Sequence, residues 1–195
     1  MTTKEKPRSA LTVLREQIPP RALTSSEVRH VLERQATRLL HLSEVLGPPV
    51  PIHAIASALP RVQVERVPNL PDSGRAHWNG QTWVLFIDAN EVGVRRRFSL
   101  AHELAHVVWH PAIDHALPDT TRAAAYDRIE RAAEYFAACL LMPRVWIKRA
   151  YYSEGIQDVP SLSHLFDVSR VAMQIRLEQL GLVIPTVTQS AKEAA

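Results

Sequence analysis

A run of five residues, His102-Glu103-Leu104-Ala105-His106, constrains the fold more than any other feature of the sequence. Residues four apart differ by about 6 Å along a helix axis and about 40° around it, so a helix presents both imidazoles to one side. One cation can then bind both histidines, and Glu103 lies beside them, placed to take a proton from a metal-bound water. Zinc favours histidine and carboxylate ligands with one position left open. The run therefore predicts a helix that carries a catalytic zinc site.

The residues around this run support a helix. Ser99 can cap a helix from Leu100 to Trp109, which Pro111 ends. The residues from 111 to 121 are expected to form a loop. Four apolar residues of the helix share a face that can be buried: Leu100, Leu104, Val107 and Val108.

A catalytic zinc site normally has three protein ligands, so a third ligand is needed besides the two histidines. A second long helix is predicted over 122–141, where Glu130 and Glu134 are again four apart on one face, among alanines and Phe136. Carboxylates in such a small-residue, apolar setting need a partner, and a metal is one. One glutamate can bind the ion while the other holds a ligand histidine in position. Helical spacing does not choose between them, and His115 in the loop also stays open as a ligand.

The remaining pattern predicts helices around a small sheet. Thr24-Ser25-Ser26 with Glu27 begins a helix that Gly47-Pro48-Pro49 stops, and a shorter helix follows at about 51–59. Alternating residues at 62–67 predict a strand. Residues 75–87 predict a hairpin, in which Asn79-Gly80 favours a type I′ turn because both residues tolerate positive φ. Helices that flank a small sheet in this order indicate an α+β fold.

Helices are also expected over 144–153 and within 158–182, where a turn at Asp167-Val168-Ser169 separates a short helix from a longer one. The sequence pattern of this pair is typical of a helix-turn-helix motif, in which Arg170, Gln174 and Arg176 can face DNA. Packing on the rest of the domain is the more favoured role, because the formal charge of +3 is a small excess. Docking of a protein partner stays open.

The composition and the N-terminal sequence indicate the cellular compartment in which the protein is expected. No stretch approaches the roughly 20 apolar residues that span a membrane, and the N-terminus lacks the apolar core of a signal peptide. A single cysteine, Cys139, forms no internal disulfide. We therefore expect a cytoplasmic protein that does not enter a membrane.

Two segments resemble the ImmA/IrrE metallo-endopeptidases: RRRFSLAHELAHVVWH at 95–110 and IERAAEYFAACLLMP at 129–143. The resemblance implies that His102 and His106 bind one zinc ion and that Glu103 is the catalytic base. The family pattern E-x-x-A-[N/D/E]-x-F-A then makes Glu130 the third metal ligand. It gives Glu134 a supporting role, or that of alternative ligand if the alignment is off by one turn.

The resemblance also implies a zincin-like domain and a substrate. Pro7, Pro19 and Pro20 predict a flexible arm at 1–24. We expect the zinc metallopeptidase domain at 25–153, the helix-turn-helix-like segment at 154–185 and a flexible tail at 186–195. Members of the family typically cleave a helix-turn-helix repressor or an antitoxin and so release a stress, mobile-element or toxin–antitoxin programme. Five further side chains are candidates for lining the cleft: His77, His110, His115, Tyr126 and Tyr135.

The alternative function is a regulatory or binding module that does not cleave its partner. Such a module would use the same scaffold within a repressor or toxin–antitoxin system and would contact DNA through residues 158–182. The complete set of catalytic residue types favours the protease, because a pure binding module has no need of Glu103.

Overall fold

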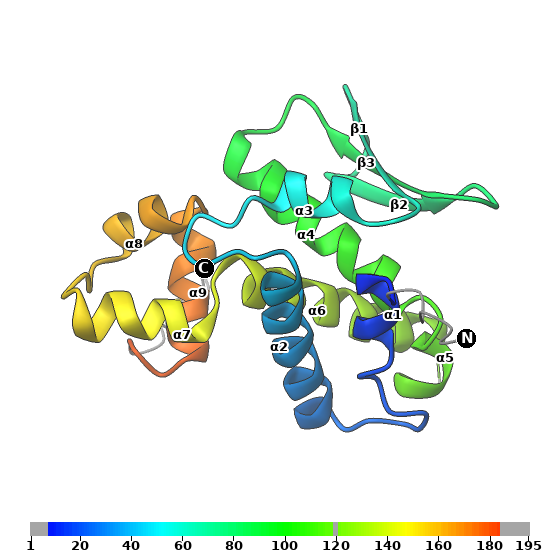
Figure 1. Ribbon diagram of the computed structural model, residues 1–195, viewed down its shortest axis with the longest axis horizontal. Helices are drawn as coiled ribbons and strands as arrows, with labels where there is room; N and C mark the ends of the chain where they lie inside the picture. Colours follow the sequence, from blue (N-terminus) through cyan, green and yellow to red (C-terminus); the bar gives the residue numbers. More distant parts are fainter. Residues whose placement is uncertain (1–7, 119–120, 184–195) are drawn as a thin grey trace, which may run out of the picture.

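The computed structural model describes residues 8–118 and 121–183 and confirms the α+β arrangement, with the helices gathered on one side of a small sheet (Figure 1). In chain order its elements are α1 (Ala10–Arg15), α2 (Ser25–Leu42), α3 (Ile52–Ala58), β1 (Val62–Val67), β2 (Gly74–Trp78), β3 (Trp83–Asp88), α4 (Gly93–Trp109), α5 (Ile113–Ala116), α6 (Arg122–Leu141), α7 (Arg144–Lys148), the π-helical turn η1 (Arg149–Ser153), α8 (Val159–Phe166) and α9 (Arg170–Gln179). In the described ranges, no helix is both long and apolar enough to cross a membrane.

Helices α4 and α6 form the centre of the molecule. Helix α4 packs against the sheet and α3 on one side and against α6 on the other, while α2 covers α6 from below (Figure 1). Ala133 and Ala137 of α6 are almost completely buried, and small side chains allow two helix backbones to approach closely. The close approach brings the polar residues of both helices into one space.

The three strands follow the order β1-β3-β2, with β1 parallel and β2 antiparallel to β3. The predicted hairpin is confirmed, but the type I′ turn is wrong. Four residues, 79–82, connect the strands, and only Gly80 of the Asn79-Gly80 pair has positive φ, at 95°. The Asn79 side chain accepts hydrogen bonds from two backbone N–H groups of the turn, at 2.8 and 3.0 Å. A side chain that bonds its own backbone stabilises this turn instead.

Helix α2 begins as predicted. The Thr24 side chain accepts a hydrogen bond from the backbone N–H of Glu27, and the Glu27 carboxylate accepts one from the backbone N–H of Thr24. This reciprocal pair satisfies two N–H groups that a helix start otherwise leaves without partners.

Helix α4 begins well before the predicted cap. It starts at Gly93, and Ser99, expected as its cap, lies inside the helix with 8% of its surface exposed. Tertiary contacts support the added turns: Arg97 donates hydrogen bonds to the carbonyl oxygens of Val50 and Asp167, at 2.9 and 3.0 Å. The predicted loop at 111–121 likewise contains a short helix, α5.

The flexible arm predicted at 1–24 is wrong for residues 8–24. Helix α1 lies against α2 and α4, and its Arg15 side chain donates to the carbonyl oxygens of Val107 and Val108. Spacings of three and four residues give this segment a helical apolar face. Its buried side chains are Leu11, Leu14, Ile18 and Leu23. Residues 1–7 and the predicted tail at 186–195 lie outside the described residues.

The buried amide of Gln35 links this N-terminal segment to α4. Its Nε2 donates to the Leu14 carbonyl oxygen at 2.8 Å, and its Oε1 accepts from the Trp109 indole N–H at 2.8 Å. A buried amide costs free energy unless its donor and acceptor are both bonded, and both groups have partners here. The N-terminal residues therefore belong to the core of the fold.

At the C-terminal side, α8 and α9 are joined by a turn in which Asp167 adopts the left-handed conformation, with φ of 51°. Ser169 then caps α9. The helix pair was predicted, and of the three side chains considered for DNA contact, Arg176 is buried. Its side chain is 1% exposed and donates to the Met142 carbonyl oxygen at 3.1 Å.

Candidate metal centre and cleft

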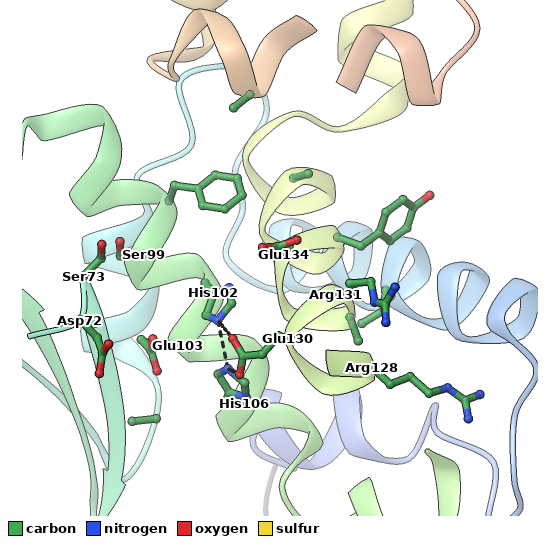
Figure 2. A pocket seen from close by; sticks show the side chains of 18 of the residues that line it. Asp72, Ser73, Ser99, His102, Glu103, His106, Arg128, Glu130, Arg131 and Glu134 are labelled. Atoms are coloured by element: carbon green, nitrogen blue, oxygen red, sulfur yellow. Dashed lines mark hydrogen bonds and ion pairs between the residues drawn. The ribbon is translucent and has the colours of Figure 1, made fainter. Parts of the chain in front are cut away.

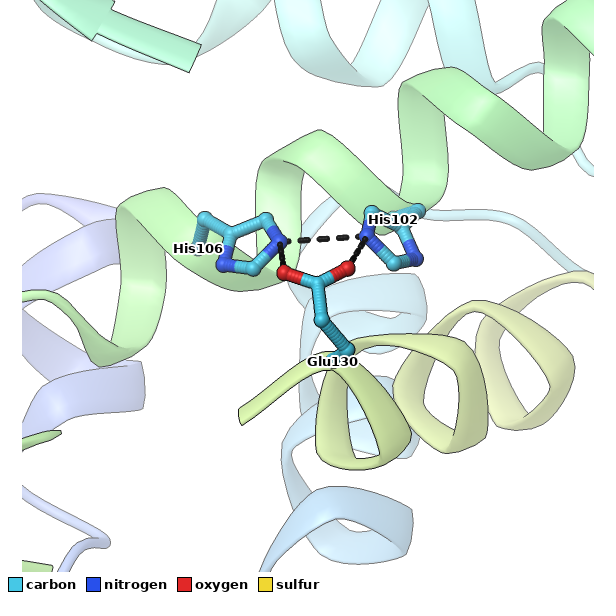
Figure 3. A group of neighbouring side chains, drawn as sticks. All are labelled: His102, His106 and Glu130. Atoms are coloured by element: carbon cyan, nitrogen blue, oxygen red, sulfur yellow. Dashed lines mark hydrogen bonds and ion pairs between the residues drawn. The ribbon is translucent and has the colours of Figure 1, made fainter. Parts of the chain in front are cut away.

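Three side chains from two helices converge on one point. His102 and His106 project from the same face of α4, and Glu130 reaches them from α6 (Figure 3). In the described part of the chain, this trio is the group of histidine and acidic residues whose ligand atoms lie within 4.8 Å of one another. The fold thus joins two sequence motifs that lie 28 positions apart, measured from His102 to Glu130.

The spacing of the three ligand atoms fits a small tetrahedral cation. The Nε2 atoms of His102 and His106 are 3.1 Å apart, and Glu130 places Oε2 3.1 Å from the first and Oε1 3.4 Å from the second. Metal–ligand bonds of about 2.0–2.1 Å give a tetrahedron with edges of roughly 3.3 Å. Two imidazoles and a carboxylate are also the ligand types that zinc prefers. The donor set therefore fits zinc in both chemistry and spacing.

Burial keeps both imidazoles ready to act as ligands. It lowers the pKa of His102, and it lowers that of His106 together with the nearby His102 charge, while Glu130 acts in the opposite direction. A lowered pKa favours the neutral ring, which retains a lone pair on one nitrogen. The side chains are nevertheless 16% and 22% exposed, so the group opens to solvent on one side.

Glu103 lies between the histidines and strand β2. It is 7% exposed, and burial raises the pKa of its carboxyl to about 7. A hydrogen bond from the backbone of Ala76 acts against this shift, whereas the negative charges of Glu130 and Asp72 add to it. A carboxyl group in this position exchanges protons near neutral pH, which suits a general base.

Strand β2 comes closest to Glu103 at Gly74. A Cβ atom built at this position would lie 3.0 Å from both Cγ and Oε1 of Glu103, closer than side chains normally pack. The backbone of Gly74 does not have positive φ, so the glycine matters here for the space that it leaves to Glu103. No spacing rule in the sequence points to Gly74 or Ala76, because only the fold brings β2 to α4.

The structure separates the alternative ligands. Glu134 is exposed and lies one helical turn along α6 from Glu130 (Figure 2). Within the described residues it forms no hydrogen bond or ion pair with His102 or His106. His115 is exposed on α5 and lies outside the cleft. The residues that the fold brings together are those of the family pattern.

A cleft of about 1650 Å³ surrounds this centre. It runs along α4, from Val92 and Phe98 near the start of the helix, past Glu103, to His110 at its end, and α2, β2, α6 and α9 line the remaining sides (Figure 2). Pockets for small molecules usually measure about 300–1,000 Å³. This cleft has room for a length of polypeptide.

Three of the five residues expected to line the cleft do so. His110 packs edge-on against Trp83 with ring centres 4.9 Å apart, and Tyr126 is 62% exposed in the cleft near Glu130. Tyr135 also lines it, but its hydroxyl donates to Oε1 of Glu33, at 3.1 Å, and is tied there. The expectation is wrong for His77, which is exposed on β2 outside the cleft, as it is for His115.

Comparison with known families matches the region that holds the site. A sequence profile of the Peptidase_M78 family, described as the IrrE N-terminal-like domain, matches residues 59–178. This range is more than half of the chain and includes the helices α4 and α6 that carry the three converging side chains.

Among solved structures, the chain is similar to a Mycobacterium tuberculosis transcriptional regulator, with a TM-score of 0.63 and 22% sequence identity. The similarity covers 88% of this chain and 52% of the other, so the chain spans about half the length of that regulator. At this identity the likeness shows a shared fold. No curated protein matches the sequence.

Proposed function

Because the chain belongs to the Peptidase_M78 family, we propose that it is a zinc-dependent endopeptidase that cleaves a regulatory protein. One observation carries the proposal: His102, His106 and Glu130 converge at the spacing of a tetrahedral cation, with Glu103 buried beside them. A structural ion pair needs neither the convergence of two imidazoles nor the adjacent carboxyl group.

The roles of the residues follow from their positions. His102, His106 and Glu130 would hold the zinc ion, which lowers the pKa of water and polarises a carbonyl group when it is bound. Glu103 accepts a proton from the water as its oxygen attacks the carbonyl carbon. It later delivers this proton to the amide nitrogen, so that the carbon–nitrogen bond breaks and the amine leaves. The exposed side of the trio faces the cleft, from which the substrate enters.

Strand β2 offers a place for the substrate backbone. Among the described strands it lies at the edge of the sheet, paired with β3, and its Gly74 and Ala76 line the cleft next to Glu103. An extended segment can hydrogen-bond to such an edge as an added strand. The scissile bond would then be held within reach of Glu103, independently of most side chains.

We infer the class of substrate from the family to which the chain belongs. The resemblance to ImmA/IrrE peptidases points to a helix-turn-helix repressor or an antitoxin, and the similar solved structure is itself described as a transcriptional regulator. The volume of the cleft agrees with a protein substrate. The alternative, a non-proteolytic module that contacts DNA through residues 158–182, has less support, because the buried Arg176 removes a charge that it would need.

The proposal is tested on a panel of helix-turn-helix repressors and antitoxins from the same genome. Purified chain loaded with zinc is incubated with each regulator, and intact mass measurement follows the products. Wild type should produce two fragments. Glu103→Gln should retain one zinc per chain and slow cleavage by at least about 100-fold, because it loses its general base.

The matched control is Glu134→Gln, which makes the same chemical change on another wall of the same cleft, where the residue is exposed. It should cleave at close to the wild-type rate. Cleavage by Glu103→Gln at the normal rate would show that the mechanism is wrong. A regulator that stays intact with wild type, while it still binds, would favour the non-proteolytic alternative.

A further inference from the structure

The cleft continues beyond the metal centre into a groove between α4 and α9. Here α4 contributes Val94 and Phe98, four residues apart, and α9 contributes Val171 and Ile175, again four apart. Residues with this spacing share a helix face, so each helix presents an apolar pair to the same space. We refer to these four residues as the α4–α9 groove.

The apolar face of α9 is open although the helix is otherwise anchored. Val171 and Ile175 are 70% and 48% exposed, whereas Met173 and Leu177 on the opposite face are fully buried. Single exposed aliphatic residues are ordinary, but a pair that lies inside the cleft of a candidate active site indicates a binding surface.

Two arginines hold this wall of the cleft in place. Arg97 of α4 forms an ion pair with Asp167, which lies at the turn before α9, at 3.0 Å. Arg176 of α9 donates to the carbonyl oxygen of Met142, directly after α6. These contacts anchor the turn before α9 to α4 and anchor α9 itself to the end of α6.

The face of α9 that opens into the cleft does not suit DNA. In a helix-turn-helix, the exposed start of the second helix reads base edges with polar or charged side chains. Here Val171 and Ile175 occupy exposed positions of that helix, and Arg176 is buried on the other side. The opening of this face into the peptidase cleft matches a protein ligand instead.

We propose that the α4–α9 groove is a specificity subsite that binds large apolar side chains of the protein substrate. The inference rests on the proposed function and extends it to a substrate class. The argument for this occupant is continuity: a polypeptide that lies over His102 and follows the cleft along α4 must pass between the two apolar pairs.

Positions along α4 also give the distance of this subsite from the cleaved bond. Phe98 and Val94 precede His102 by four and eight residues, about 6 and 12 Å along the axis. An extended substrate advances about 3.3 Å per residue. The groove therefore accepts apolar side chains about two to four residues from the cleaved bond, on one side of it.

A proteome-derived peptide library tests the subsite. Zinc-loaded full-length chain is incubated with the library, and mass spectrometry identifies the cleaved bonds and their flanking residues. Wild type should prefer Leu, Ile, Val, Met or Phe two to four residues from the bond, on one side. The double variant Val171→Ser plus Ile175→Ser should lose this preference and cut such peptides about 10-fold more slowly, while its zinc content stays at wild-type level.

The matched control is Val145→Ser. Val145 is 73% exposed on α7 and lies outside the cleft, so the same chemical change there should alter neither rate nor preference. Because all three residues are exposed, the substitutions leave the buried core intact, and thermal unfolding of each variant verifies this.

The possible failures are distinguishable. If wild type with zinc cuts no peptide and no regulator, the proposed function is wrong. If it cuts peptides without an apolar preference, or if the double variant keeps the preference, the subsite alone is wrong. If the double variant instead loses affinity for random duplex DNA, or changes from dimer to monomer with unchanged cleavage, the occupant is DNA or a second copy and the inference is overturned.

Discussion

Gly74 of the edge strand lies directly against Glu103 of the central helix. An added Cβ at position 74 would come within 3.0 Å of both Cγ and Oε1 of that glutamate. The contact ties the position of the carboxyl group to the backbone of β2, the strand that we expect to hold the substrate. The same strand, β2, therefore positions both the general base and the backbone of the substrate.

This contact predicts a catalytic defect from a single methyl group. Gly74→Ala should displace the Glu103 carboxyl group and slow cleavage of the regulator by about 10- to 100-fold, because small displacements of reacting groups are costly. Zinc content should not change, since Gly74 does not contact the trio that would bind the ion. Gly93→Ala is the control, because a Cβ there has no neighbour within 4 Å. Equal rates for Gly74→Ala and wild type would show that the carboxyl group has room to move.

The two glutamates of α6 should differ in metal binding. Glu130→Gln removes a charged oxygen that lies 3.1 Å from His102 and should weaken zinc affinity by about 100-fold or more. Glu134→Gln should leave the affinity unchanged, since Glu134 is exposed one turn away. Competition with a fluorescent zinc chelator measures both constants. The reverse order of effects would place the ligand one turn further along α6.

The extent to which the sequence predicts this site depends on the range of the interactions. His102, Glu103 and His106 are related by helical spacing, which is a local property. The choice of Glu130 came from resemblance to a family, because Glu130 and Glu134 share one helix face. Gly74 could not be found from either source, since its role depends on how a strand packs against a helix about 30 residues away.

The errors elsewhere have the same physical origin. Ser99 satisfies a capping rule, but bonds from Arg97 to distant carbonyl groups support the helix through that point. Arg176 was assigned to an exposed face because helical periodicity does not tell which face is covered. In the N-terminal segment, Pro19 and Pro20 suggested an arm, although Leu11 and Leu14 already had helical spacing.

The N-terminal segment should therefore contribute to stability. Leu14 is fully buried, and Leu14→Ala should lower the free energy of unfolding by about 2–5 kcal/mol through lost burial and a residual cavity. Leu46→Ala is the matched control, because Leu46 is 89% exposed and its truncation should change stability by less than about 0.5 kcal/mol. Urea unfolding followed by tryptophan fluorescence measures both. Equal stabilities of the two variants would mean that α1 is detached in solution.

Arg176 should be needed for the attachment of the C-terminal helix pair. Its guanidinium is buried, donates to the Met142 carbonyl oxygen and lies 3.6 Å from the Glu33 carboxylate. Arg176→Met keeps most of the side-chain volume but leaves the carbonyl group without this donor, so it should lower the free energy of unfolding by about 2–4 kcal/mol.

The control for this variant is Arg170→Met, the same change at an exposed position of the same helix. It should alter stability by less than about 0.5 kcal/mol. Hydrogen exchange then distinguishes local from global effects: in Arg176→Met, the amides of α8 and α9 should lose more protection than those of α4. Uniform loss across the fold would instead show that Arg176 stabilises the whole domain, and unchanged exchange would show that apolar contacts alone hold the pair. The first outcome is expected because α4 is held by its own contacts with the sheet and α6, whereas the hydrogen bond of Arg176 ties α9 to Met142 at the end of α6.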